Sequence, residues 1–545
     1  MAKETLYASV TDEKAPSRAI PDDQPGAAAS LPDTRPDTTP QDLPRTTSPD
    51  SSREFAVTAP EKGTDKDIEV DAGHAERDFE VWWEEPEEQD PECPLNWPAW
   101  RKVGTIVLIS LLGLLTPLAS SMFAPGVPDV IDDFDTDSNT LATFVVSIYV
   151  LAFAFGPLLF APLCEKIGRT WVYHISNVLF VIFTICNAVS VNMGMLIAFR
   201  FLAGFVGVAA VTIGSGTIAD MVRPEQRGLA LASWSMGPIL GPVIGPVAGG
   251  FLIEAAGWRW VFWVIAIATG VLTIFCFVFL KETHHGIILE RKAERLRKET
   301  GNPEWHVRAE SKVADNAKEG IVKSFTRPLR ILLFSSVCSM MCIYVAVLYG
   351  LLYILFTTFS FVFEDVYQFS TSASGLSYLG SGIGTITGLL YAMKLADRRY
   401  RQKLAAGQKP QPEDRLPLYM IIPAVLTIPA GFFIYGWGAD YKVHWIVPQI
   451  GTAVTGFGVI IVLMCINTYL VDTYTINSSS AIAANTVLRS VLGGLLPLCG
   501  LDIYDSLGLG WGNTLFGFLA LGLAPIPVFF AFWGERLRIK HGLLV

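Results

Sequence analysis

The stretch GPILGPVIGPVAGG, residues 237–250, decides the fold, because it sets five glycines and three prolines inside a long apolar run. Gly237, Gly241, Gly245 and Gly249 recur every four residues, so a helix would place all four on one side. Small residues at this spacing let a second helix pack closely in lipid. We interpret the stretch as the packing face of a membrane-crossing helix.

Pro238, Pro242 and Pro246 form a second row on the same helix. Each proline lacks an N–H, so the carbonyl four residues earlier loses its helical donor and the helix should bend. Such carbonyls are tolerated in a membrane only where protein or cavity water satisfies them. The prolines therefore predict a bent helix inside a bundle, away from lipid and beside a solute pathway. An ordinary packing face is the alternative.

The composition and the apolar runs of the whole chain indicate a membrane protein. Of the 545 residues, 51% are hydrophobic and only 17% are charged. A membrane crossing needs about 20 mostly apolar residues, and twelve runs qualify: 103–124, 141–163, 170–190, 194–218, 229–252, 258–280, 335–361, 373–395, 417–437, 445–470, 481–501 and 513–533. They predict an all-α membrane protein with twelve transmembrane helices in two six-helix bundles.

The charge distribution sets the expected domain limits. Residues 1–100 hold 24 acidic and 9 basic residues and are rich in Pro, Ser and Thr, a composition that does not bury enough apolar surface to fold. We expect a disordered acidic cytosolic tail (1–98), an N-terminal bundle (99–283), a cytosolic central loop (284–330), a C-terminal bundle (331–534) and a cytosolic tail (535–545).

Basic residues gather in alternate loops, and positive charge marks the cytoplasmic side of short loops. One set of loops, besides the central stretch, carries Lys166, Arg169, Arg223, Arg227, Arg398, Arg399, Arg401, Lys403, Arg536, Arg538 and Lys540. The opposite set carries only Arg259 and Lys442. Both termini and the central loop are therefore predicted to face the cytosol. We expect the plasma membrane, with a vacuolar membrane as the alternative.

Six short motifs follow one another along the chain: DPECPLNWPAWRK (90–102), LCEKIGR (163–169), RFLAGFVGVAA (200–210), the stretch 237–250, RPLRILLF (327–334) and ANTVLRS (484–490). In combination they resemble the major facilitator superfamily, in particular its twelve-span fungal drug:proton antiporters, over about residues 90–540. The resemblance implies two halves that rock around a central cavity and exchange an outgoing solute for protons. Ala161, Glu165 and Thr170 depart from the Gly, Asp and basic residue usual at their positions.

Ionisable groups inside a membrane helix cost about 2.5–3.5 kcal/mol on insertion scales, so each one calls for a reason. Arg200 and Arg489 are such groups, and no Asp or Glu lies at the middle of any run. The resemblance associates Arg200 with proton movement, and Asn485 shares a helix face with Arg489, so both could donate to a solute. Structural hydrogen bonding is the alternative. The expected pathway residues are Tyr149, Arg200, Trp234, Tyr353, Tyr378, Asn467, Asn485 and Arg489.

A second group of candidates lies at the predicted cytoplasmic ends of the helices. A Leu-x-acid-base pattern ends at Lys166 after the second run and at Arg398 after the eighth, as expected for repeated halves. A carboxylate there can bind the N-terminus of a neighbouring helix and hold one conformation. The resemblance makes the eleventh helix the partner of Glu165. We expect a conformational latch of Glu165, Lys166, Arg169, Asp220, Arg227, Asp397 and Arg398.

These patterns favour a secondary exporter of small organic compounds, such as drugs, toxins, secondary metabolites or organic acids, in exchange for protons. Proton-coupled uptake of a nutrient is the alternative. A pump or an enzyme is disfavoured, since neither GxxxxGK[ST] nor HExxH occurs. Because the buried charges are positive, a neutral amphipath or an organic anion is favoured over a polycation. We expect a monomer in the lipid bilayer that uses the proton gradient, with no cofactor, metal or nucleic-acid partner.

Overall fold

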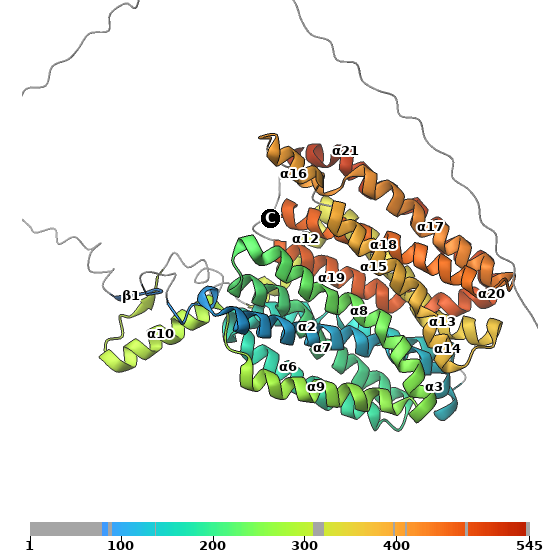
Figure 1. Ribbon diagram of the computed structural model, residues 1–545, viewed down its shortest axis with the longest axis horizontal. Helices are drawn as coiled ribbons and strands as arrows, with labels where there is room; N and C mark the ends of the chain where they lie inside the picture. The colour runs from blue at the N-terminus through green and yellow to red at the C-terminus, as the bar shows by residue number, and fades with distance from the viewer. Residues whose placement is uncertain are drawn as a thin grey trace, which may run out of the picture. The chain divides into compact units, whose positions relative to one another are not determined.

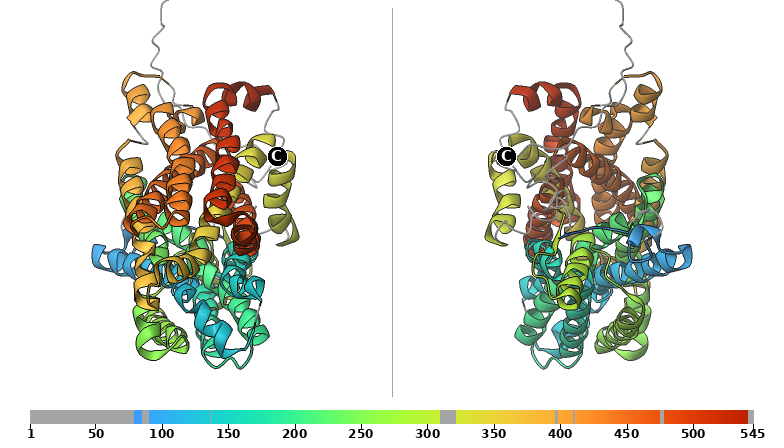
Figure 2. Two further views of the ribbon diagram at one scale, coloured as in Figure 1. Left: turned by 90° about the vertical axis from the view of Figure 1, so that its right-hand side faces the viewer. Right: turned by 90° about the vertical axis from the view of Figure 1, so that its left-hand side faces the viewer.

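The computed structural model describes residues 79–84, 90–136, 138–308, 321–395, 398–408, 411–474 and 478–540. These ranges are largely helical, and the helices form two groups that follow one another along the chain (Figure 1). Figure 2 shows the same two groups from two further sides. Residues 1–78 of the predicted acidic tail lie outside the described residues.

The first half runs from α2 to α9. Its elements are α2 (Ala99–Ser121), η4 (Ala124–Gly126), α3 (Val127–Asp133), α4 (Asn139–Ala152), α5 (Gly156–Ile167), α6 (Arg169–Ala188), α7 (Met193–Met221), α8 (Pro224–Ala256) and α9 (Arg259–Phe279). The predicted second crossing is divided into α4 and α5, because Gly156 and Pro157 begin a new helix there.

The second half runs from α12 to α21. Its elements are α12 (Ile321–Phe334), α13 (Ser336–Tyr367), α14 (Thr371–Leu376), α15 (Tyr378–Leu395), α16 (Arg398–Ala405), η5 (Pro412–Arg415), α17 (Leu418–Asp440), α18 (Ile446–Thr473), α19 (Ser478–Leu495), η7 (Leu496–Cys499), α20 (Gly500–Leu523) and α21 (Pro525–Lys540).

The helix lengths agree with the predicted membrane protein. Within the described ranges, ten helical segments are long and apolar enough to cross a bilayer. One of them, Ser478–Arg538, has 61 residues, far more than the roughly 20 that one crossing needs. Gly508, with a φ of 75°, breaks the helix inside this segment, and α14 with α15 covers the predicted eighth crossing. The structure is therefore consistent with twelve crossings.

The glycine row of α8 packs against α2. A Cβ atom added at Gly237 or Gly241 would lie 2.6 Å or 2.8 Å from the nearest backbone atom of α2. One added at Gly249 would overlap the carbonyl oxygen of Met122, directly after α2. Only glycine allows the two backbones to approach so closely, and this is the packing face that the four-residue spacing predicted.

Several side chains of α8 outside the glycine row are exposed. Met236 is 48% exposed, Ile244 43% and Phe251 53%. Side chains that face lipid and side chains that line a solute pathway are both exposed in this way, so the expectation that this helix lies away from lipid stays a prediction. The three prolines lie inside a helix that continues from Pro224 to Ala256, and the bend stays a prediction.

The two halves of the chain touch through small residues at two places. A Cβ atom at Gly250 of α8 would lie 2.8 Å from a carbonyl oxygen of α14. Beside it, the Glu254 carboxylate accepts the backbone N–H of Ser372 at 3.0 Å. At the second place, a Cβ atom at Gly494 of α19 would lie 2.6 Å from that of Leu151 of α4. These contacts hold the two halves together in the observed conformation.

A small unit joins the start of the described chain to the region between the two halves. Strand β1 (Glu80–Val81) pairs in parallel with β2 (His306–Val307), and η3 (Pro94–Asn96) and α10 (His285–Thr300) complete the unit. Trp83, Cys93 and Leu289 form its core, against which Trp82, Leu95, Ile288 and Val307 pack.

Asp90 anchors this unit. Its carboxylate accepts the N–H groups of Glu84 at 2.9 Å and Glu92 at 2.8 Å and lies 3.7 Å from Nζ of Lys292 on α10. Burial raises the pKa of Asp90, but the two N–H donors and the Lys292 charge outweigh it and hold the pKa below its usual value. The expectation of a disordered tail up to residue 98 is corrected here: the described part of 79–98 is folded, because its tryptophans and Cys93 find apolar partners.

Candidate functional site

Arg200 of α7 is 1% exposed. Its Nε donates to the carbonyl oxygen of Val145 at 2.6 Å, and its Nη2 donates to that of Ser120 at 3.1 Å. The guanidinium carbon lies 4.8 Å from the ring centre of Phe123 and 5.2 Å from that of Tyr149. In the part of the chain that the structure describes, carbonyls and aromatic faces surround this charge, and no ion pair with a carboxylate forms.

Tyr149 and Trp234 are buried between helices of the same half. The Tyr149 hydroxyl of α4 donates to the Thr116 carbonyl oxygen of α2 at 3.0 Å. Trp234 of α8 packs on α2 and α7, where a Cβ at Gly113 would lie 3.4 Å from its Nε1. This Nε1 is buried and forms no hydrogen bond with any residue that the structure describes. Both side chains therefore belong to the contacts that surround α2.

Asn467, Asn485 and Arg489 come together in the second half. Nδ2 of Asn485 on α19 donates to Oδ1 of Asn467 on α18 at 2.8 Å. Arg489 lies one turn further along α19, and its guanidinium carbon is 5.1 Å from the ring centre of Tyr349 on α13. The prediction that Asn485 and Arg489 share one side of a helix agrees with the structure, and Asn467 joins them through its hydrogen bond to Asn485.

The two remaining tyrosines lie on α13 and α15. The ring of Tyr353 is 4.9 Å from that of Tyr349, which places it beside the Arg489 group. Tyr378 is 1% exposed, and its hydroxyl donates to the carbonyl oxygen of Phe356 at 2.5 Å. Tyr353 is thus a neighbour of Arg489, whereas Tyr378 belongs to a packed aromatic cluster.

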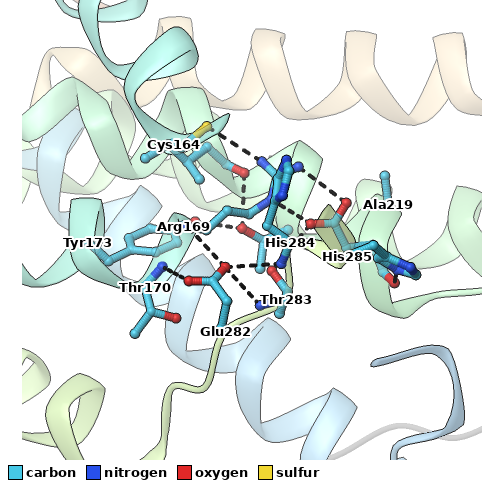
Figure 3. Close-up of polar contacts among 12 residues, drawn as sticks. Cys164, Arg169, Thr170, Tyr173, Ala219, Glu282, Thr283, His284 and His285 are labelled. Atoms are coloured by element: carbon cyan, nitrogen blue, oxygen red, sulfur yellow. Dashed lines mark hydrogen bonds and ion pairs between the residues drawn. The ribbon is translucent and has the colours of Figure 1, made fainter. Parts of the chain in front are cut away.

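Arg169 and its partners form a polar cluster at the α6–α7 helix ends (Figure 3). Nε of Arg169 donates to Oδ2 of Asp220 at 2.5 Å, and its Nη2 donates to Oδ1 at 3.2 Å. This bidentate pair joins the start of α6 to the end of α7. Close by, Nη2 of Arg227 donates to the Ala219 carbonyl oxygen at 2.8 Å. Three of the predicted latch residues therefore meet at the end of α7.

The carboxylate that binds a helix N-terminus in this cluster belongs to Glu282, which the sequence analysis missed. It accepts the N–H groups of Arg169 at 2.9 Å and Thr170 at 3.3 Å, the first two residues of α6 (Figure 3). The partial positive charge of that helix end favours a carboxylate. Gly168 makes room for it, since its φ is 92° and a Cβ there would collide with Glu282. An acidic residue two positions after the end of a long apolar run was the available signal.

Glu282 also connects the cluster to α10. Its Oε1 accepts the N–H of His284 at 3.0 Å, and Nε2 of His285 lies 2.8 Å from the Asp220 carbonyl oxygen. Burial lowers the pKa of His284 below its usual value. The ring of Trp83 contacts that of His285 with 5.5 Å between centres. The cluster thus extends to the small unit that carries β1 and β2.

The other predicted latch residues lie elsewhere. Glu165 and Lys166 are exposed on the last turn of α5, and Arg398 is exposed at the start of α16. Asp397 lies outside the described residues. Within the described ranges, no hydrogen bond or ion pair joins Glu165 to the cluster around Arg169. The binding of Glu165 to the eleventh helix, which the resemblance implies, stays a prediction.

Glu282→Gln is expected to destabilise the protein. The amide keeps an acceptor oxygen but loses the negative charge that suits the positive end of α6. Hydrogen bonds to a charged group contribute about 1.5–3 kcal/mol, so the unfolding free energy should fall by about 1–2 kcal/mol. The midpoint of thermal unfolding of the purified protein measures this change. Glu299→Gln, on the exposed end of α10, is the control, and equal midpoints for both variants would contradict the prediction.

Comparison with known proteins gives the family. The family model of the Major Facilitator Superfamily matches residues 109–497. Efflux pump radE of Floropilus chiversii is 47% identical over 473 residues, which cover 86% of this chain and 87% of that protein. MFS-type transporter tndD of Aspergillus flavipes is 48% identical over 502 residues, which cover 90% and 92% of the two chains.

Solved structures with the same fold are more distant. A D-xylose-proton symporter superposes with a TM-score of 0.58 at 16% identity, covering 78% of this chain and 97% of that one. An inward-facing bacterial homologue of the human lysosomal transporter Spinster gives 0.52 at 14% identity, covering 82% and 99%. At such identities the likeness shows the fold alone. With the family model matched over most of its length, and with relatives that share nearly half of their residues, this chain belongs to the Major Facilitator Superfamily, a family of multi-pass membrane transporters.

Proposed function

We propose that this protein exports small organic compounds, secondary metabolites among them, in exchange for protons. One observation supports this most directly: the glycine row of α8 packs backbone to backbone on α2, and the end of the same helix touches α14 of the other half. This row coincides with the stretch that resembles the antiporter signature. The relative from Floropilus chiversii, which bears the name of an efflux pump, adds support.

The contacts suggest how the two halves move. The α8–α14 contact closes one end, which the loop charges predict to be extracellular, and opening that end requires these small residues to separate. The Arg169–Asp220 pair and Glu282 join α6, α7 and the segment after α9 inside one half. They therefore stiffen the first half so that it moves as one body, while the contacts between the halves change.

The charges within the membrane helices favour some classes of solute over others. Arg200 and Arg489 are cations within membrane helices, and none of the predicted crossings carries an Asp or Glu at its middle. A polycation would meet repulsion there, whereas a neutral amphipath or an organic anion would not. We propose a solute of these two kinds, a proton gradient as the energy source, and a monomer in the plasma membrane with both termini in the cytosol.

Membrane vesicles of opposite orientation test the direction of transport. Inverted and right-side-out vesicles that contain the protein are given a pH gradient, and the fluorescence of the neutral amphipath Nile red is followed. Export in exchange for protons predicts gradient-dependent accumulation in inverted vesicles with an acidic interior. Accumulation only in right-side-out vesicles in an acidic medium would favour proton-coupled uptake and overturn the proposal.

A further inference from the structure

Arg489 is a charged side chain on a membrane helix and has no charged partner among the residues that the structure describes. The residue is partly exposed, but its Nε is buried and makes no hydrogen bond. Among the described residues, no carboxylate forms an ion pair with it. A charge without such a partner is costly on a membrane helix and marks a functional position.

Aromatic side chains fix the position of the guanidinium group. Its carbon atom lies 5.1 Å from the ring centre of Tyr349, and the ring of Tyr353 is 4.9 Å from that ring. One turn beyond Arg489, a Cβ at Gly493 would lie 2.8 Å from Cδ1 of Tyr349. The absence of a side chain at Gly493 therefore lets α19 press Tyr349 toward Arg489. The cation–π contact holds the group without neutralising it.

Asn485 adds an acceptor to the same side of α19. It is 1% exposed, and its Nδ2 is fixed by the 2.8 Å hydrogen bond to Oδ1 of Asn467. Its own Oδ1 is buried and has no hydrogen-bond partner in the described part of the chain. Leaving a buried acceptor unpaired costs about 1–3 kcal/mol. One helical turn of α19 thus presents an unpaired cationic donor and an unpaired acceptor.

The Arg489 group lies where the two halves meet. A Cβ at Gly493 would be 3.4 Å from Cγ1 of Val150 on α4, in the other half. At the next residue of α19, a Cβ at Gly494 would lie 2.6 Å from the Cβ of Leu151, which also belongs to α4. A molecule bound at Arg489 would therefore contact the surface along which the halves move.

We infer that Arg489, Tyr349 and Asn485 form a recognition site for the carboxylate of an aromatic hydroxy acid. A guanidinium group binds a carboxylate through parallel N–H donors, and the tyrosine rings offer an apolar face for the aromatic body. A hydroxyl group of the same molecule donates to the free Oδ1 of Asn485. This inference rests on the proposed export function and narrows its solute class to one kind of organic anion.

Binding of an acid and of its neutral ester tests the site. Purified full-length protein is titrated with 2,4-dihydroxybenzoate and with its methyl ester, and calorimetry gives the two dissociation constants. The unchanged protein should bind the acid at least about tenfold more tightly, since a charge-assisted hydrogen bond contributes roughly 1.5–3 kcal/mol. Arg489→Gln should abolish that preference by weakening binding of the acid, while Arg489→Lys should keep part of it.

Controls separate this result from a folding defect. Arg291→Gln removes an exposed charge on α10 and should keep the full preference for the acid. Each variant must also elute as a monodisperse peak and unfold within a few degrees of the unchanged protein. Equal binding of acid and ester by the unchanged protein, or an unaltered preference in Arg489→Gln, would overturn the site. If the acid fails to bind while gradient-driven Nile red transport persists, the site is rejected and the proposed export stands.

Discussion

Gly249→Ala is expected to lower the stability of the protein and to impair transport, and Gly249→Val to do so more strongly. A Cβ atom at this position would overlap the carbonyl oxygen of Met122, which is backbone and does not yield as a flexible side chain would. Overpacking of this kind costs about 1–3 kcal/mol. Because α8 packs on α2 and also touches α14 of the other half, the same change should reduce gradient-driven Nile red accumulation. Thermal unfolding and the vesicle assay measure the two effects.

Gly270→Ala is the matched control for this prediction. Gly270 lies inside α9, and a Cβ atom there would have nothing within 4 Å. Alanine should be neutral or slightly stabilising at Gly270, since it is favoured over glycine in helices by about 0.5–1 kcal/mol. If the alanine variants at 249 and 270 unfolded at the same temperature, close packing of α2 on α8 would not be the role of the glycine row.

The spacing of the α8 glycines predicted a packing face, but it did not identify the helix that packs there. A repeat of four residues depends only on helix geometry, whereas α2 becomes the partner through the arrangement of the whole bundle. For the same reason the sequence did not show that Met236 and Phe251, away from the glycine row, are exposed. Local periodicity specifies which residues share a side and leaves open what covers the others.

Hydropathy located the crossings better than it located the helix ends. The second crossing contains the break between α4 and α5 at Gly156, whereas the break at Gly508 lies between the predicted crossings 481–501 and 513–533, inside the observed helix α20. The break at Gly156 lies within apolar sequence, so an average over about 20 residues does not detect it. Glycine and proline at such positions are weak signals, since Pro238 and Pro242 lie inside a continuous helix in the same protein.

The polar residues of the candidate site were predictable in part. Arg169 and Asp220 are charged residues at predicted helix ends, and the structure joins them. Glu282 was missed because its partners lie 113 and 112 residues earlier, and no spacing rule connects them. The fold of residues around Asp90 was missed for a related reason. Its acidic surroundings suggested disorder, and the apolar face of α10 that covers the tryptophans is distant in sequence.

Arg200→Lys is expected to reduce gradient-driven transport at least about tenfold. Lysine keeps the positive charge but does not reproduce a planar group that donates to Val145 and Ser120 at 2.6 Å and 3.1 Å. Loss of one charge-assisted hydrogen bond corresponds to roughly 1.5–3 kcal/mol, or about one to two powers of ten. Ser120 is in the last turn of α2, where carbonyls lack helical donors, so no N–H of α2 replaces the lost contact. The vesicle assay, normalised to folded protein, measures the effect.

Arg259→Lys is the control for the replacement of arginine by lysine. Arg259 pairs with Asp133 at 2.5 Å, and its side chain is 42% exposed, so lysine should restore most of that contact and leave transport unchanged. Two measurements, the unfolding temperature and the pH dependence of transport, distinguish a structural role of Arg200 from a role in proton exchange. Loss of an anchor alone lowers the unfolding temperature but leaves the pH dependence of transport per folded molecule unchanged, whereas a role in proton exchange shifts that dependence. An Arg200→Lys protein that transports like the original would show that neither contact of Arg200 matters for the transport cycle.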